Sequence, residues 1–405
     1  MSKSSSRVVI VDYRWDMPAK DDSQAKQLLH SKDKLWENRI EQLSERFSQD
    51  FHGASSFDGI FYPSIEERFA LEGIDEEKTT YLLSSERITL SLFQSLINQN
   101  VVTTKHDVLV SNGSAQTDLI SKSAYLGMQG VDFMKAIELL DPLAYLKMLR
   151  LSRPPAIQMV SEASTSGIGA LYSGYNAVKK GKFNTALVGG SCASTMPFPH
   201  ELSHFGFGSD RFTQPFEQGA SGHYFSEGGV AFLIKERQQA LADGDHILAE
   251  IKDITAGTMG SPVINRNAVK KLVLQSLADA GVLPTDEIFM DLYGRANEID
   301  DTAEFSCLKN VQKVFPGLKG GYLKQHAQYM IGYYGLIGLC RLLESKKNNT
   351  ELQGRVVTQP NSYIGKIEPD QWTTQVNDYP WITMPMYSMH GNVYNLVIHM
   401  NPDEG

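Results

Sequence analysis

Hydrophobic and polar positions follow one another in short blocks, and each block has the period of one kind of secondary structure. Residues 8–11 and 228–236 are mostly apolar runs of the length of a buried strand. Residues 86–98 instead place their apolar side chains three and four positions apart, the spacing of a helix with one buried face. The pattern predicts strands that alternate with helices, as in parallel or mixed sheets covered by helices.

The second half of the chain repeats this rhythm, which predicts an internal duplication. The halves are expected to meet between residues 235 and 250, so we place the two domains at residues 1–240 and 241–405. In the first half, residues 159–191 are expected to form a strand, a turn, a helix and a second strand. The second half is expected to contain helices at 268–281 and 332–344 and strands at 287–292 and 393–400.

Segment 159–191 places Ser164 at the expected start of its helix. Free N–H groups point outward at a helix N-terminus and favour an anion or a nucleophile there. A serine hydroxyl keeps its proton at pH 7 and needs a positioned base to react, and no base accompanies it in this segment. Serine is also a common helix cap, because its oxygen accepts from those N–H groups. The residues alone favour the cap.

The composition limits the possible partners and compartments. A formal charge of -9 over 405 residues argues against a nucleic-acid partner, because phosphate binding needs a basic surface. No run approaches the roughly 20 apolar residues of a membrane span, and the N-terminal apolar run is too short for a signal peptide. Three widely spaced cysteines (Cys192, Cys307 and Cys340) suggest a reducing compartment. We expect a soluble cytoplasmic protein.

One short pattern resembles a metal site. His200 and His204 fit the His-Glu-x-x-His spacing that grips zinc from one face of a helix. Pro197 and Pro199 precede the pattern and Gly206 follows it, so barely two helical turns fit between them. We therefore expect no metal here, and a zinc hydrolase is kept only as a distant alternative.

Four segments together resemble the β-ketoacyl synthases of the thiolase fold. The strongest match is residues 214–245, QPFEQGASGHYFSEGGVAFLIKERQQALADGD, and segment 159–191 is similar to that family's nucleophile segment. DLYGRANEIDDTAE (291–304) and KQHAQYMIGYYG (324–335) follow in the order of the family's two histidine motifs. The resemblance implies an α/β thiolase fold in which two duplicated halves form a five-layered αβαβα sandwich.

Active members of this family use a cysteine and two histidines, and this chain departs at all three positions. The resemblance places Ser164 at the cysteine and Tyr293 and Tyr329 at the histidines, so no catalytic set is intact. His326 is the one histidine within the two histidine motifs (291–304 and 324–335), which leaves Ser164 and His326 as weak catalytic candidates. Four further matching positions are expected to be structural: Lys324 as an ion-pair partner, Asp301 and Glu304 as surface or capping groups, and Gly391 in the C-terminal glycine segment.

A ketosynthase fold without these residues is similar to the non-catalytic chain-length factors of type II polyketide synthases. That similarity implies a heterodimer with an active, Cys-containing ketosynthase, in which the strand before Ser164 pairs across the dimer axis. It also implies contact with an acyl carrier protein and with the growing polyketide chain, and no cofactor. The expected tunnel residues are Met128, Phe133, Met134, Leu140, Tyr145 and Met148.

Two other functions remain open at this point. An acyltransferase could use Ser164 as its nucleophile, with help from His326 or a water molecule. A non-catalytic partner in quinolone or fatty-acid-type assembly would carry a different acyl chain. The residues do not identify the product, its length or the partner.

Overall fold

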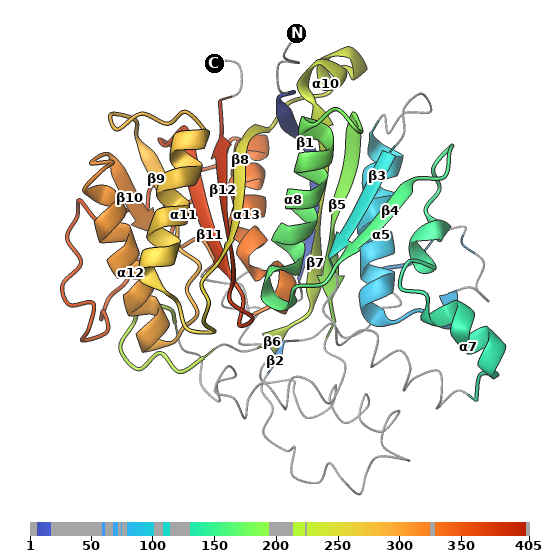
Figure 1. Cartoon of the computed structure of the whole chain (residues 1–405), viewed down its shortest axis with the longest axis horizontal. Coiled ribbons are helices and arrows are strands. Elements are labelled where there is room, and N and C mark those ends of the chain that lie inside the picture. Colours follow the sequence, from blue (N-terminus) through green and yellow to red (C-terminus); the bar gives the residue numbers. More distant parts are fainter. Residues whose placement is uncertain are drawn as a thin grey trace, which may run out of the picture.

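Figure 1 shows the fold in a computed structural model of the chain. The structure describes residues 6–17, 59–60, 68–71, 74, 79–100, 108–113, 130–193, 214–222, 225–324 and 329–401. Most of the alternating pattern found in the sequence lies inside them.

The strands form two five-stranded arrays. The first contains β1 (Val8–Asp16), β3 (Val108–Gly113), β4 (Ala156–Val160), β5 (Thr185–Cys192) and β7 (Gly228–Glu236). The second contains β8 (Ala249–Thr258), β9 (Ile288–Asp291), β10 (Leu318–Gly321), β11 (Trp381–Tyr387) and β12 (Asn392–His399). A separate short pair joins β2 (Gly59–Ile60) to β6 (Phe225–Ser226).

The two arrays have the same topology, as an internal duplication requires. Their orders are β4-β3-β5-β7-β1 and β10-β9-β11-β12-β8, which is third, second, fourth, fifth, first along the chain in both. In each array the first three of these strands pair in parallel and the last two join antiparallel. The arrays meet where Val8 to Ile10 of β1 pair with Ile251 to Ala249 of β8. The domain boundary at residue 240 stays a prediction.

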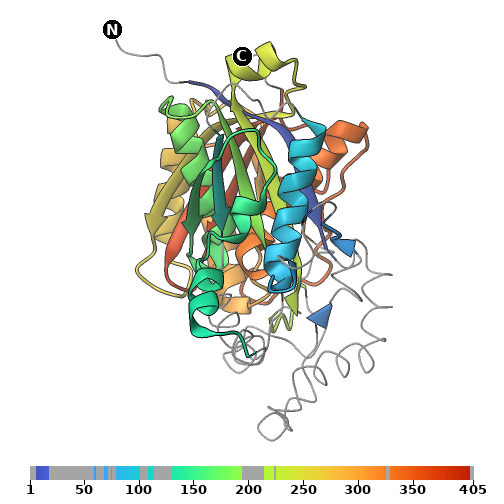
Figure 2. The same ribbon diagram turned by 90° about the vertical axis from the view of Figure 1, so that its right-hand side faces the viewer.

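Helices cover both faces of both arrays. In Figure 1, α8 (Ser166–Lys179) and α13 (Tyr334–Asn348) lie in the centre, where each contacts strands of both arrays; Figure 2 gives the view from the side. On the outside, α5 (Ser84–Gln99) packs on the first array, and α11 (Arg266–Asp279) and α12 (Glu298–Gln312) pack on the second. The layers are therefore αβαβα, and the thiolase fold implied by the sequence is confirmed.

Burial on both faces explains the apolar runs of the central strands. All eight residues of β5, and all but the last of β7, are buried, because α5 covers one face of these strands and α8 the other. Such strands are expected to be continuously hydrophobic rather than alternating. Smaller elements complete the chain: α7 (Phe133–Leu140), η1 (Tyr145–Met148) and α10 (Arg237–Asp243).

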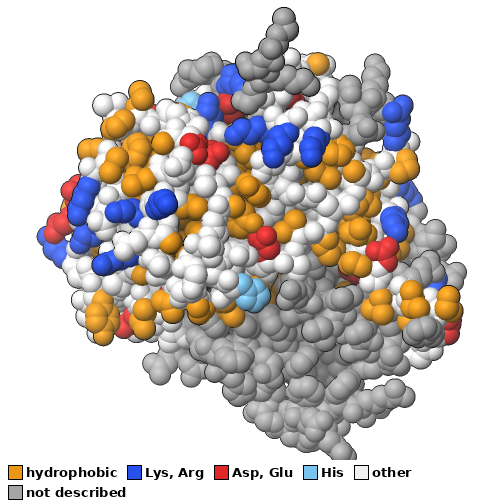
Figure 3. All heavy atoms as spheres, viewed as in Figure 1, with side chains coloured by type: hydrophobic (Ala, Val, Ile, Leu, Met, Phe, Trp, Pro, Cys, Tyr) orange, Lys and Arg blue, Asp and Glu red, His pale blue; other side chains and the backbone are white. Residues whose placement is uncertain are grey.

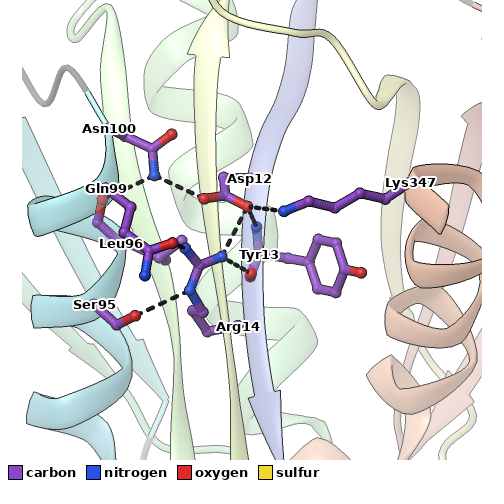
Figure 4. A network of polar contacts seen from close by, with 8 residues as sticks. All are labelled: Asp12, Tyr13, Arg14, Ser95, Leu96, Gln99, Asn100 and Lys347. Carbon is purple, nitrogen blue, oxygen red and sulfur yellow. Dashed lines mark hydrogen bonds and ion pairs between the residues drawn. The ribbon is translucent and has the colours of Figure 1, made fainter.

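A polar network on β1 connects an outer helix to a central one (Figure 4). Asp12 accepts from Asn100 Nδ2, just after α5, and from Arg14 Nη1, both at 2.8 Å. Lys347 in the last turn of α13 approaches the same carboxylate at 3.5 Å. Burial pushes the pKa of Asp12 up, but the hydrogen bonds from Asn100, Arg14 and Tyr13 outweigh burial and lower it. Asp12 is thus ionised, and its carboxylate connects the end of α5 to the end of α13 across β1.

The second array packs against α13 at a glycine. A side chain on Gly338 would overlap Oδ2 of Asp291, the last residue of β9. Only a residue without a Cβ lets the helix approach this closely.

We therefore expect Gly338→Ala to lower the free energy of unfolding by about 1–3 kcal/mol, since overpacking forces the helix or the strand to shift. Urea denaturation followed by circular dichroism measures the change. Gly354→Ala is the control, because a Cβ there meets its neighbours at ordinary distances of 3.5 Å and more. Equal stability of the two variants would contradict this account of the packing.

Candidate functional site

Two matching turns bring the halves together at the centre of the molecule. The turn η2 (Ala163–Thr165) leads into α8, and η3 (Ile331–Tyr333) leads into α13. Ala163 and Ile331 both have positive φ, 49° and 32°, which is rare for residues with side chains and marks strained backbone. A Cβ on Gly167 would lie 2.7 Å from the carbonyl oxygen of Gly332. The two helix N-termini therefore touch through backbone.

Ser164 lies in the first turn and is only 5% exposed. Its Oγ accepts a 2.7 Å hydrogen bond from Oη of Tyr329, a residue of the other half. The N-cap of α8 is Thr165, which makes no side-chain cap hydrogen bond. The cap role that the sequence favoured for Ser164 is therefore wrong, because its hydroxyl is held by Tyr329 instead.

Tyr293 lies beside this pair in a cluster of buried tyrosines. Its ring packs edge-to-face on Tyr334 and Tyr387, with centroids 5.3 and 5.6 Å apart, and Tyr329 packs on Tyr334 at 5.3 Å. Burial, with the nearby Tyr329 hydroxyl, raises the pKa of Tyr293 well above its ordinary value. Tyr293 is therefore a neutral phenol at physiological pH.

Asp301 and Glu304 hold the backbone around Tyr293. Glu304 accepts from the N–H groups of Tyr293 (2.6 Å) and Gly294 (2.9 Å), and Asp301 accepts from the N–H of Arg295 (3.0 Å). Both carboxyl groups are fully buried, so the surface position expected for them is wrong. They lie three positions apart on α12, which turns both toward this loop.

Burial controls the protonation of both acids. It raises the pKa of Asp301 well above its ordinary value and that of Glu304 to about 7. The two backbone N–H groups and the hydroxyl of Tyr387, which donates to Glu304 at 3.2 Å, offset part of that shift. Glu304 therefore titrates close to neutral pH.

Lys324 forms a buried ion pair beneath the tyrosines. Its Nζ lies 2.6 Å from Oδ2 of Asp291 and donates to the carbonyl oxygen of Leu292 at 2.9 Å. The N–H of Leu323 donates to the other carboxylate oxygen at 3.0 Å. Burial raises the pKa of Asp291, and Lys324 opposes that shift. This pair ties the loop after β9 to the loop after β10.

The remaining expected positions are scattered or undescribed. Gly391 has φ 82° in the turn between β11 and β12, and its carbonyl accepts from the N–H of Met259 at 2.7 Å. His326, Met128, His200 and His204 lie outside the described residues. No group of three or more metal-binding side chains is arranged for an ion within the described ranges.

The expected tunnel residues that the structure describes do not gather at Ser164. Met134 on α7 is 72% exposed, and Leu140 and Met148 are partly buried. Tyr145 is buried, and its hydroxyl accepts from Asn112 Nδ2 at 2.7 Å. Phe133 belongs to α7, but its side chain is not described. The tunnel stays a prediction about an assembly with a partner.

Arg295 is a site residue that sequence reasoning missed. It is 8% exposed, and its Nη1 donates to the carbonyl oxygen of Pro262 (2.9 Å) and to Asp300 Oδ2 (3.2 Å). The one available signal was a charged residue directly after the Tyr293-Gly294 pair, inside a motif-like segment. Tyr334 and Tyr387 were missed because their positions depend on the packing of α13 and β11.

In chemical terms, the group that the described residues place at Ser164 Oγ is a hydroxyl and not a thiol. Within the described residues, the partner of Ser164 Oγ is a phenol, which donates a proton and does not remove one. General-base assistance is typically worth about 10²–10⁴-fold in rate. The arrangement can position hydrogen bonds, but it does not by itself activate Ser164.

No described helix is long and apolar enough to cross a bilayer.

Residues 152–240 match the family described as β-ketoacyl synthase, N-terminal domain. The chain is 28% identical over 221 residues to norsolorinic acid synthase of Dothistroma septosporum, covering 51% of this chain and 9% of that protein. It is 26% identical over 224 residues to polyketide synthase PksN of Bacillus subtilis, covering 52% of this chain and 4% of that protein. The chain thus spans less than a tenth of these relatives.

Solved structures share the whole fold at low sequence identity. A β-ketoacyl synthase from Burkholderia phymatum gives a TM-score of 0.76 with 16% identity, covering 98% of this chain and 99% of that one. A protein described as the ishigamide ketosynthase/chain length factor gives 0.73 with 14% identity, covering 98% and 100%. These likenesses establish the fold.

The titration of Glu304 gives a test of the site's electrostatics. Its pKa in the folded protein, about 7, lies above its ordinary value of 4.5. Its contribution to stability is therefore fully present below about pH 4.5 and is lost as the pH rises through 7. Because of this group, we expect the free energy of unfolding of the wild-type protein to fall by on the order of 3 kcal/mol between these two pH values. Glu304→Gln is expected to lack this part of the pH dependence.

Urea unfolding at several pH values measures the free energy of unfolding of the two proteins. Asp291 and Asp301 contribute to the pH dependence of both, so the difference between the two profiles reports on Glu304. Glu298→Gln, on the same helix but at an exposed contact to Gly219, is the control. Parallel pH profiles for wild type and Glu304→Gln would contradict the assignment.

Proposed function

Taking the chain as a ketosynthase-like protein of the thiolase fold, we propose that it is a non-catalytic chain-length factor. In this proposal it forms a heterodimer with an active ketosynthase in the cytoplasm and shapes the tunnel of the growing polyketide chain. The partner receives acyl groups from an acyl carrier protein. The proposal rests on one main observation, the arrangement of Ser164, Tyr329 and Tyr293.

That arrangement lacks the groups that carbon–carbon bond formation needs. A thiolate takes up an acyl chain readily, whereas a serine hydroxyl held by a phenol remains a weak nucleophile. Tyr293 keeps its proton because burial raises its pKa. The phenols can donate hydrogen bonds but cannot replace two histidines as acid and base. Loss of all three groups on a preserved fold supports a structural role.

The open edge of the first array supports a partner beside β4. β4 pairs with β3 on one side, and no described strand pairs with its other side. At the equivalent edge of the second array, Gly320 of β10 exchanges hydrogen bonds with Gln371 and Thr373, so that edge is covered. An uncovered strand offers N–H and C=O groups to another chain. β4 leads directly to Ser164, as the proposed pairing across a dimer axis requires.

Helix α7, on the same side of the molecule as β4 in Figure 1, exposes apolar side chains. Met134 and Ile137 on α7 are three positions apart and lie at the surface, and hydrophobic atoms gather there at the lower right of Figure 3. Side chains three positions apart share one helix face. In the proposed dimer this face joins β4 in the interface and borders the tunnel with Tyr145 and Met148.

The α7 face gives a direct test of the heterodimer. Met134→Glu with Ile137→Glu places two carboxylates in the proposed interface, and burying an unpaired charge costs more than about 1.4 kcal/mol. We expect the affinity for a co-expressed, Cys-containing ketosynthase to fall by roughly tenfold or more. Size-exclusion chromatography with light scattering and titration of the purified subunits measure it.

Both positions are exposed in the single chain, so its own unfolding free energy is expected to change by less than about 0.5 kcal/mol. The matched control is Leu241→Glu with Leu283→Glu, two exposed apolar residues away from α7. A heterodimer that tolerates the α7 variant as well as the control would argue against this interface.

An acyltransferase that uses Ser164 is the second candidate. The observation in its favour is the strained turn, which holds Ser164 at the start of α8 as nucleophile turns do. This function predicts a covalent acyl group on Ser164, whereas the chain-length factor does not require one.

Intact-mass spectrometry separates the two functions. After incubation with acyl-loaded carrier protein, we expect no mass increase, because no described base lies at Ser164 Oγ. An adduct that disappears in Ser164→Ala but persists in the control Ser166→Ala would overturn the non-catalytic proposal. Ser166 is a suitable control because its hydroxyl donates to Ala163 O in the same turn.

A further inference from the structure

Helices α11 and α12 present five basic side chains on the outside of the second array. Arg266, Lys271, Lys309 and Lys313 are exposed, and Lys270 is half-buried. Within the part of the chain that the structure describes, none of the five forms an ion pair with a carboxylate. In Figure 3, Lys and Arg side chains gather at the left, over these two helices. The five residues are called the basic face below.

The acids of the same two helices do not neutralise the basic face. Glu298 in the first turn of α12 accepts from the N–H of Gly219, and the three other acids of α12 are buried: Asp300, Asp301 and Glu304. The one acid of α11, Asp279, is its last residue and accepts from Gln275 Nε2 at 2.8 Å. The whole chain carries a formal charge of -9, so the rest of it carries -14 once these five cations are set apart. A basic face on an acidic molecule favours an anionic partner at that place.

The cations have the spacing of side chains that share a helix face. Arg266 and Lys270 are four positions apart on α11, and Lys309 and Lys313 are four positions apart on α12. Side chains at this spacing are neighbours, about 5–6 Å apart at their Cβ atoms. Because α11 and α12 pack against each other, a further helix laid along them can bring its carboxylates opposite both pairs. Acidic residues three or four positions apart on that helix would match the cations.

An extended polyanion fits the basic face less well than one acidic helix does. Nucleic acid and an anionic membrane reach beyond the five cations and meet the surface of a chain whose other residues are acidic overall. Screening limits strong attraction to about 8 Å at physiological ionic strength, so a compact partner experiences mainly the basic face. Charge complementarity therefore favours a short acidic element of a protein.

We propose that the basic face is the docking site for an acidic helix of a second partner protein. This site goes beyond the proposed function, because it lies away from the β4 edge. α11 and α12 pack on β8, β10, β11 and β12, and β10 is at the opposite end of the strand order from β4. The basic face therefore remains open in the proposed heterodimer, and the chain can bind two proteins at once.

Two synthetic helical peptides test the docking site on the full chain. Both are stapled helices of equal length with the same number of glutamates. One peptide aligns its glutamates on one face at three- and four-residue spacing, and the other distributes them around the helix. We expect the aligned peptide to bind roughly tenfold more tightly in fluorescence anisotropy, because only it places its carboxylates opposite both helices. Added salt is expected to weaken this binding.

A charge reversal on both helices gives the matching test in the protein. Lys271→Glu with Lys313→Glu replaces attraction by like-charge repulsion, so the affinity for the aligned peptide is expected to fall roughly tenfold or more. Lys180→Glu with Lys182→Glu is the control, since these exposed lysines follow α8 and give the same change in net charge. We expect the control to keep the affinity within about twofold. All four positions are half-buried or exposed only at the surface, and circular dichroism checks that both variants fold.

Three outcomes would overturn the proposal. Equal binding of the two peptides, or an equal loss in the control variant, would show that net charge alone attracts the peptide. Tighter binding of duplex DNA, or of vesicles that contain phosphatidylglycerol, would favour an extended polyanion instead. Loss of the heterodimer with a ketosynthase in Lys271→Glu with Lys313→Glu would make the basic face part of that interface and exclude a second partner there.

Discussion

The close approach of two helix N-termini is the constraint on which the rest of the site depends. Gly167 on α8 lies against the carbonyl oxygen of Gly332 before α13, so the turns of the two halves meet without side chains between them. This contact brings Ser164 and Tyr329, 165 positions apart in sequence, to 2.7 Å. Duplication supplied two copies of one strand–turn–helix unit, and their contact made a single site.

Buried acids stabilise the second half of that site at an electrostatic cost. Asp291, Asp301 and Glu304 are removed from water, and burial raises the pKa of each. Their oxygens accept from backbone N–H groups of the loops that carry Tyr293 and Lys324. A buried carboxyl group that bonds backbone fixes a loop in one conformation. The framework that would orient a catalytic residue is thus retained around a phenol.

The preserved framework and the changed side chains lead to different conclusions. The fold, the strained turns and the ion pair describe a ketosynthase-like protein, and the relatives agree with that level of description. At Ser164 Oγ the described residues place a phenol, which donates a hydrogen bond, and no base. Our proposal gives this site a role in binding and assembly, and it places the catalytic partner at the edge of β4 that no described strand covers.

The sequence by itself determined the alternation of strands and helices and the duplication, because these follow from local periodicity; Ser164, Tyr293 and Tyr329 were expected at the site through the resemblance to a family. Tertiary structure alone decided that Ser164 is held by Tyr329 rather than capping α8, and that Asp301 and Glu304 are buried. It also decided the place of Arg295 in the site. These facts depend on contacts between residues far apart in the chain, and no local pattern encodes which buried polar group faces which.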